Sequence, residues 1–107
     1  METKKPFGQA LRLARLKKGL LQENFEAVSS RQTISFLERG GSSVTLQKLD
    51  HLCSVLDVHP ATMVALTYML AETAQKPSSD DLIKIISKQL KALEHFQDLL
   101  TQSNLHS

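Results

Sequence analysis

The sequence lacks the residue patterns that build disulfides, zinc sites and membrane spans. Its single cysteine cannot form a disulfide within the chain, and its four histidines come with no Cys-x-x-Cys pair to complete a structural zinc site. No apolar run approaches the roughly 18 residues that span a bilayer, and residues 1–6 are not followed by the apolar core of a signal peptide. We therefore expect a cytoplasmic protein with a reduced thiol, no metal ion and no membrane contact.

Aromatic residues are also scarce, since there is no tryptophan, one tyrosine and four phenylalanines. A core that is poor in aromatics and rich in leucine is typical of packed helices. With 107 residues the chain holds one small domain and at most a short extra element, which excludes multidomain enzymes. No Ser-His-Asp, paired-carboxylate or Gly-rich phosphate signature is convincing, so we expect no enzymatic activity, no cofactor and no small-molecule ligand.

Charge is unevenly distributed along the chain. Residues 1–40 contain eight Lys/Arg and four Asp/Glu, a formal charge of +4, whereas residues 41–107 contain five Lys and seven Asp/Glu, a formal charge of −2. This asymmetry suggests an N-terminal region that faces a polyanion such as double-stranded DNA, and a C-terminal region with another task. A solvated basic face without a partner is equally compatible with it.

Hydrophobic periodicity predicts an all-α fold with five short helices in a domain of residues 1–74. The predicted helices are Phe7–Lys18, Gln22–Val28, Arg31–Arg39, Leu46–Leu56 and a fifth that begins at Pro60 and reaches Leu70. Ser29 or Ser30 caps the third helix, Thr45 caps the fourth, and Pro6 suits the first position of the first. The positions predicted to be apolar and inward include Phe7, Leu11, Leu13, Leu16, Phe25, Val28, Ile34, Leu37, Leu46, Leu49, Leu52, Cys53, Leu56, Met63 and Val64.

Residues 75–79 are a linker by composition, and residues 80–107 are predicted to be dominated by one long amphipathic helix, about Asp80 to Gln102. Its apolar stripe follows a 3-4 spacing through Ile83, Ile86, Leu90, Leu93 and Leu100. Two interpretations remain open for this stripe. It forms a dimer interface, or it packs on the five-helix domain of its own chain.

Three segments in order carry a resemblance to a known family: Gly8-Gln-Ala-Leu-Arg-Leu-Ala-Arg15, Lys18-Gly-Leu-Leu-Gln22 and Thr33-Ile-Ser-Phe-Leu-Glu-Arg-Gly40. Together they resemble the XRE family of helix-turn-helix regulators, which has the fold of the lambdoid phage repressors and Cro. The resemblance covers about Phe7 to Leu66. It implies a lambda-repressor-like DNA-binding domain whose third predicted helix enters the major groove.

Ile34 and Leu37 would hold that recognition helix to the core, which leaves its opposite face for base edges. The residues expected to contact bases are Arg31, Gln32, Ser35 and Phe36. By the resemblance, Arg31 and Gln32 occupy the two leading positions and Phe36 a third, one turn later. Arginine suits guanine, glutamine suits adenine, and an aromatic ring suits the thymine methyl group. The alternative for Phe36 is a place in the core.

The resemblance also implies phosphate contacts and a structural ion pair. Gln22 is similar to the family's glutamine that binds backbone phosphate from the start of the second helix. Further plausible phosphate contacts are Lys17, Lys18, Arg39, Ser42 and Ser43. Arg15 and Glu38 match the family's partly buried pair that ties the first helix to the end of the third.

The chain departs from the family pattern before the recognition helix. The segment from Gln22 to Ile34 is two residues shorter than usual and lacks the turn glycine, and Leu21 stands where a Ser/Thr cap is usual. We therefore expect a truncated second helix with uncapped amides. His51 and Cys53 point about 200° apart on a helix and cannot share a metal ion, so a buried Cys53 is the better interpretation.

The sequence thus predicts a sequence-specific transcriptional regulator, a repressor that binds a two-fold symmetric operator as a homodimer. The alternative is an antitoxin or protein-interaction adaptor, whose C-terminal helix grips another protein and whose helix-turn-helix serves autoregulation.

Overall fold

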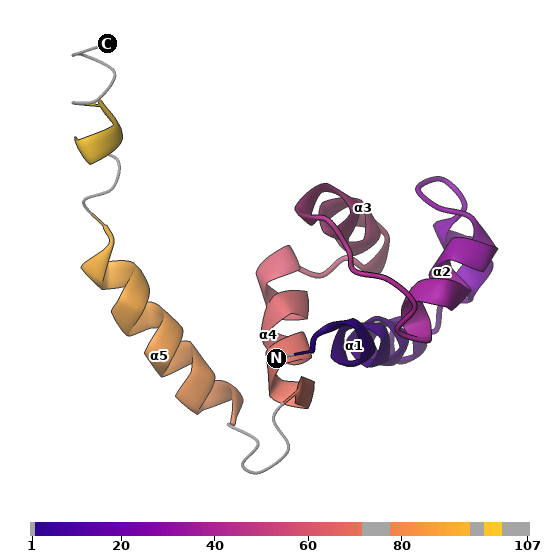
Figure 1. Cartoon of the computed structure of the whole chain (residues 1–107), viewed down its shortest axis with the longest axis horizontal. Coiled ribbons are helices and arrows are strands. Elements are labelled where there is room, and N and C mark those ends of the chain that lie inside the picture. The colour runs from indigo at the N-terminus through magenta and orange to yellow at the C-terminus, as the bar shows by residue number, and fades with distance from the viewer. Residues whose placement is uncertain (1, 72–77, 95–97, 102–107) are drawn as a thin grey trace. The chain divides into compact units, whose positions relative to one another are not determined.

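The computed structural model describes residues 2–71, 78–94 and 98–101, and every regular element in them is a helix (Figure 1). The elements are α1 (Lys4–Lys17), the 3-10 helix η1 (Gln22–Phe25), α2 (Arg31–Glu38), α3 (Leu46–Leu56), α4 (Pro60–Ala71) and α5 (Ser79–Ala92). The predicted all-α class is confirmed. The chain divides into two compact units, Met1–Lys76 with α1 to α4 and Pro77–Ser107 with α5.

Helix α1 begins earlier than predicted, at Lys4, so that Pro6 is its third residue and not its first. The Glu2 carboxylate accepts hydrogen bonds from the backbone N–H groups of Lys4, at 2.6 Å, and Lys5, at 3.3 Å. These two bonds lower the pKa of Glu2. Because the first-turn amides of a helix have no partner within it, Pro6 removes no helical hydrogen bond at this position.

The core of the first unit is built where α1, η1, α2, α3 and α4 turn their apolar sides inward. Figure 1 shows α1 between α2 and α4, the two elements with which it makes most of its contacts. The buried apolar residues are Phe7, Ala10, Leu11, Phe25, Ile34, Leu37, Leu49, Leu52, Cys53, Leu56 and Met63. Each large side chain fully buried here stabilises the fold by about 1.5–3 kcal/mol relative to an exposed one.

Three leucines and one valine predicted to face inward do not, and the valine is Val64, which is 38% exposed. Leu46 is 82% exposed because it is the first residue of α3, beyond the edge of the core. Leu13 and Leu16 are exposed on α1. At 3.6 residues per turn they lie about 200° and about 140° round the helix from buried Leu11, which places them on the outer side.

The predicted truncation of the second helix is confirmed, and it goes further than expected. Instead of two turns to Val28, the chain forms the single 3-10 turn η1 and then bends, with the N–H groups of Val28 and Ser29 both donating to the Phe25 carbonyl, at 2.9 and 2.8 Å. As predicted, the Leu21 side chain caps none of the first-turn amides. The N–H of Leu21 itself donates to Asn24 Oδ1 at 2.7 Å. Phe25 is fully buried, so this short element still contributes its ring to the core.

The predicted caps of the next two helices are confirmed. The Ser30 side chain accepts from the Thr33 N–H at 3.1 Å and starts α2, and Thr45 accepts from the Lys48 N–H at 3.0 Å and starts α3. Each bond satisfies one of the amides left unpaired at a helix start, which is worth about 1 kcal/mol. The two caps therefore set where α2 and α3 begin.

The second unit differs from the predicted long helix. Ser78 caps α5 by accepting from the Asp81 N–H at 3.1 Å, and α5 ends at Ala92 with Leu93 as its C-cap. A continuous helix to Gln102 is therefore wrong, although residues 98–101 are again helical. Of the predicted linker 75–79, residues 75–77 lie outside the described part of the chain, and Ser79 is already helical. None of the residues in α5 is buried.

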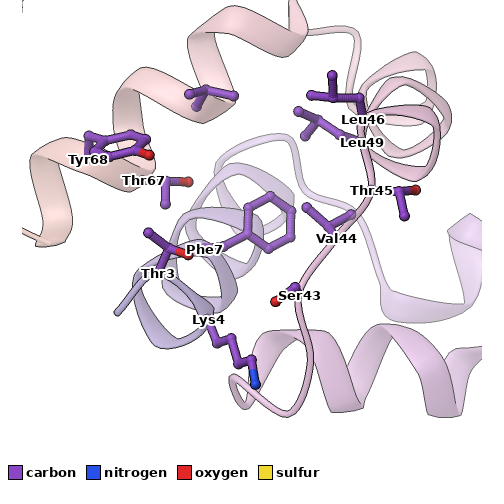
Figure 2. Close-up of a pocket in the computed structure, with 11 residues that line it drawn as sticks. Thr3, Lys4, Phe7, Ser43, Val44, Thr45, Leu46, Leu49, Thr67 and Tyr68 are labelled. Atoms are coloured by element: carbon purple, nitrogen blue, oxygen red, sulfur yellow. The ribbon is translucent and has the colours of Figure 1, made fainter. Parts of the chain in front are cut away.

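An apolar groove of about 200 Å³ runs between the start of α1, the segment before α3, and α4 (Figure 2). Phe7 lies at its centre, with Val44 on one side and Tyr68 on the other. The Thr67 hydroxyl in its wall donates to the Met63 carbonyl at 2.7 Å. In the described part of the chain, every buried side-chain nitrogen or oxygen has a hydrogen-bond partner.

Burial of Cys53 in α3 predicts an unreactive thiol. Desolvation is the main cause that raises the pKa of Cys53, with a smaller contribution from the charge of Asp50, so little thiolate forms near neutral pH. We expect the native protein to react with a disulfide reagent such as DTNB at pH 8 at least a hundredfold more slowly than the chain unfolded in guanidinium. Equal rates in the two states would place the thiol at the surface.

Candidate nucleic-acid interface

Helix α2 is held to the core by one face and leaves the other faces at the surface. Ile34 and Leu37 are buried, and Gly8 of α1 lies directly against the carbonyl end of α2. A Cβ at Gly8 would approach the carbonyl oxygens of Leu37 to 2.5 Å and Glu38 to 2.6 Å, so only glycine permits this packing. The side chains expected to contact bases lie on the remaining faces of α2: Arg31, Gln32, Ser35 and Phe36.

A shallow concavity of about 290 Å³ joins η1 to α2, and we refer to it as the α2 concavity. It is lined by Gln22, Arg31, Gln32, Ser35 and Arg39, five residues that the sequence assigned to DNA contacts. The lining contains two arginines and no carboxylate, with amide and hydroxyl groups between them. Arginine, glutamine and serine side chains are those that bind base edges and phosphates.

An ion pair beneath this surface connects α1 to the end of α2. Arg15 Nε lies 2.6 Å from Glu38 Oε2, and Arg15 Nη2 donates to Glu38 Oε1 at 3.0 Å, so the guanidinium and the carboxylate meet through two parallel bonds. The Arg15 side chain is 10% exposed and that of Glu38 is 5% exposed. The hydrogen bond with Glu38 raises the pKa of Arg15, which keeps the guanidinium charged.

The same pair also holds the segment before α2. Arg15 Nη1 donates to the Leu20 carbonyl at 2.9 Å, and the Gln22 side-chain amide donates to Glu38 Oε1 at 3.3 Å. Gln22 is therefore positioned by Glu38 at the edge of the α2 concavity. A primary amide has two N–H groups, so one remains for a phosphate oxygen.

The other expected phosphate contacts are more scattered. Lys17 is the last residue of α1 and Lys18 its C-cap, and both are exposed. Ser42 and Ser43 follow α2, but Ser43 lines the apolar groove of Figure 2 and neither lines the α2 concavity. Arg39 lies in the concavity, where its Nε donates to the Ser35 carbonyl at 3.3 Å.

Phe36 is 47% exposed, so the alternative that placed it in the core is wrong. It does not line the α2 concavity. Its ring lies against the backbone of Gly41, in the space that a side chain at that position would occupy.

Sequence analysis missed two residues that position α2. Gly8 begins the first of the three family-like segments, and its role is to let the backbone of α1 approach the end of α2. Lys48 of α3 donates from Nζ to the Val28 carbonyl at 3.0 Å and so holds the turn between η1 and α2. No local pattern predicts the Lys48 contact, because its partner lies 20 residues away.

Among the residues that the structure describes, no group of three or more His, Cys, Asp or Glu side chains is arranged to hold a metal ion. No single helix in that part is long and apolar enough to cross a membrane, although α3 and α4 together, bent by 103°, pass a test of length and composition.

An all-helical domain with a short surface helix that presents cations and amides is the architecture of a helix-turn-helix DNA-binding domain. The sequence model of the helix-turn-helix family matches residues 11–63. These residues form a helix-turn-helix domain of the XRE/Cro/C1 type, a DNA-binding family whose members are typically not enzymes. No curated protein matches the chain.

The matched segment runs from α1 into α4 and contains the Arg15–Glu38 pair, α2 and the α2 concavity. The elements that position the candidate interface therefore belong to the family domain. Helix α5 lies outside the match.

Removing one partner of the ion pair should destabilise the domain. In Arg15→Ala the Glu38 carboxylate stays mostly buried without its cation, so we expect the free energy of unfolding to fall by about 3 kcal/mol. Urea unfolding followed by circular dichroism measures this change. Arg12→Ala is the matched control, because Arg12 is exposed on the same helix, and it should change the free energy by no more than about 0.5 kcal/mol. Equal effects in the two variants would contradict a structural role for the pair.

Proposed function

We propose that this protein is a sequence-specific transcriptional repressor that binds a two-fold symmetric operator as a homodimer. The observation that carries the proposal is the α2 concavity, which gathers side chains for base and phosphate contacts on one surface. Its two arginines attract the phosphate backbone, and its amide and hydroxyl groups offer directional hydrogen bonds.

Base contacts are assigned to the exposed side of α2. Arg31 lies at the first position of the helix and can donate two hydrogen bonds to guanine, and Gln32 beside it can pair with both groups of adenine. Ser35 follows one turn later, and Phe36 offers an apolar ring to a thymine methyl group. A helix that enters the groove with its N-terminal turn foremost brings Arg31 and Gln32 closest to the bases.

Phosphate contacts are assigned to the residues around this helix. Gln22 is proposed to bind a phosphate from the start of η1 while Glu38 holds its amide, and Arg39 closes the concavity from the other end of α2. Lys17 and Lys18 at the end of α1, with Ser42 and Ser43 after α2, are proposed to contact the backbone on either side.

Dimerisation is assigned to α5. One recognition helix contacts too few base pairs for genomic specificity, and two-fold pairing places a second helix about one turn of DNA away. Ile83, Ile86 and Leu90 lie on one face of α5, while Lys84, Lys88 and Lys91 lie on the other by helical spacing. Leu93 at the C-cap and Leu100, beyond the end of α5, are proposed to belong to the same interface. Because all five stripe residues are exposed, a partner is needed to cover them.

The first test compares base-contacting with phosphate-contacting residues. Arg31→Ala and Gln32→Ala should each cost about 1–3 kcal/mol on the preferred sequence and relax the preference at particular base pairs. Gln22→Ala should weaken binding to all sequences by a similar factor. Selection from a random DNA library, followed by titration over a salt series, measures both effects.

Wild-type affinity should fall steeply with salt in the same series, because the basic residues displace condensed counterions from the DNA. Affinity that is independent of salt, or an Arg31→Ala variant that keeps the wild-type sequence preference and affinity, would contradict the proposed orientation of α2.

The second test concerns assembly. Leu90→Asp places a charge on the proposed stripe and should yield a monomer that keeps the helical signal of the first unit but loses tight operator binding. Ile85→Asp is the matched control, since Ile85 is exposed on the same helix but lies about 140° round the helix from Leu90. Analytical ultracentrifugation and circular dichroism separate the outcomes.

Three results would contradict a dimer built on α5. A folded dimer of Leu90→Asp would place the interface elsewhere, and loss of the fold would mean that the stripe covers the protein's own core. A wild-type monomer that co-purifies with another protein would support the antitoxin or adaptor alternative.

A further inference from the structure

The end of α2 is closed by a pair of glycines in a defined backbone motif. The Gly40 N–H donates to the Leu37 carbonyl at 3.0 Å, and the Gly41 N–H donates to the Phe36 carbonyl at 2.9 Å. Gly40 has a φ of +77°, the left-handed conformation that favours glycine. This is the Schellman arrangement, in which two hydrogen bonds hold the residues after a helix at a fixed position relative to its last turn.

Gly41 has a different reason to be glycine. Its φ is not positive, so its backbone conformation does not require glycine. A Cβ built on Gly41 would instead lie 2.5 Å from both Cδ1 and Cζ of Phe36, and closer still to Cε1 between them. The Phe36 ring therefore occupies the volume that any other residue at position 41 would fill.

The three distances also show which part of the ring meets the backbone. If the Cβ built on Gly41 lay in the plane of the ring beyond Cε1, its distances to Cδ1 and Cζ would be clearly longer than its distance to Cε1. They are nearly equidistant, so Gly41 faces the flat side of the ring. Phe36 as a whole residue is 47% exposed, and the contact of its ring with Gly41 uses one side of the ring.

Schellman motifs commonly pair an apolar side chain at the position of Gly41 with the residue at the position of Phe36. In this chain the ring packs on bare backbone instead. That contact limits the directions the ring can take and leaves apolar surface open on the helix that carries Arg31 and Gln32.

We propose that Gly41 is a positioning residue for sequence recognition, because its missing side chain holds the Phe36 ring where the open face of the ring meets a thymine methyl group. This inference rests on the proposed function and deepens it. Phe36 lies four residues after Gln32, about 6 Å farther along α2. Successive base pairs are about 3.4 Å apart, so the thymine lies within about two base pairs of the one that Gln32 contacts.

The probe for this contact is DNA in which uracil replaces single thymines of the selected half-site, since the exchange removes only the methyl group. The wild-type full chain should lose about fourfold in affinity at one thymine, the value of one apolar carbon group removed from contact. Phe36→Ala should be insensitive to the exchange at that position. Gly41→Ala should lose the sensitivity or move it to another thymine, because a Cβ displaces the ring.

The double variant Phe36→Ala/Gly41→Ala is the internal control. With no ring to displace, the added methyl group should change nothing, so the double variant should bind like Phe36→Ala. Preferences at the base pairs assigned to Arg31 and Gln32 should stay the same in all variants. Circular dichroism checks that each variant is folded, and Phe36→Leu replaces Phe36→Ala if the latter is not.

A measurement without DNA tests the geometry directly. The Gly41 Hα protons near the flat side of the ring should resonate upfield of their usual NMR positions in the wild type. The shift should disappear in Phe36→Leu. Usual Hα positions in the wild type would overturn the inference.

The outcomes separate this inference from the proposed function. A wild-type protein that selects no DNA sequence overturns both. A wild type that selects a sequence but tolerates uracil at every thymine overturns the inference alone. A Gly41→Ala variant that remains as sensitive as the wild type to uracil at the same thymine also overturns the inference alone.

Discussion

The ion pair between Arg15 and Glu38 is the interaction on which the arrangement of the DNA-binding domain depends. One guanidinium joins α1, the Leu20 carbonyl and the end of α2, and the same carboxylate holds Gln22. A helix of eight residues such as α2 is not stable alone, so its direction is decided by what it packs against. Two parallel hydrogen bonds between nearly buried charges restrict that direction more than apolar contacts do, because they weaken steeply when distance or angle changes.

Two glycines permit close packing at the C-terminal end of α2. Gly8 lets the backbone of α1 approach the carbonyl end of α2, and Gly41 lets the Phe36 ring lie on the backbone after it. Neither has the positive φ that explains Gly40. The need for glycine at Gly8 and Gly41 is steric, because neighbouring atoms leave no room for a Cβ at either position.

The second unit presents a different physical problem. Helix α5 has a well-formed cap at Ser78 and acidic residues in its first turn, both of which stabilise its start. Its apolar face is nevertheless exposed, and at 14 residues it is too short to be stable by helix propensity alone. A partner surface that covers Ile83, Ile86 and Leu90 resolves this problem, which is why assembly and DNA binding are proposed together.

The sequence by itself determined the helical class, the family domain, a serine cap at position 29 or 30, the cap at Thr45, and the burial of Phe25, Ile34, Leu37 and Cys53. These features follow from signals that act over one or two turns, namely periodicity and capping. Tertiary structure decided how far the second helix is shortened, the exposure of Leu46, the Lys48 contact and the packing of Phe36 on Gly41. Each of these features depends on contacts between distant parts of the chain or on where a helix ends relative to the core. The local spacing of residues encodes neither of these two causes.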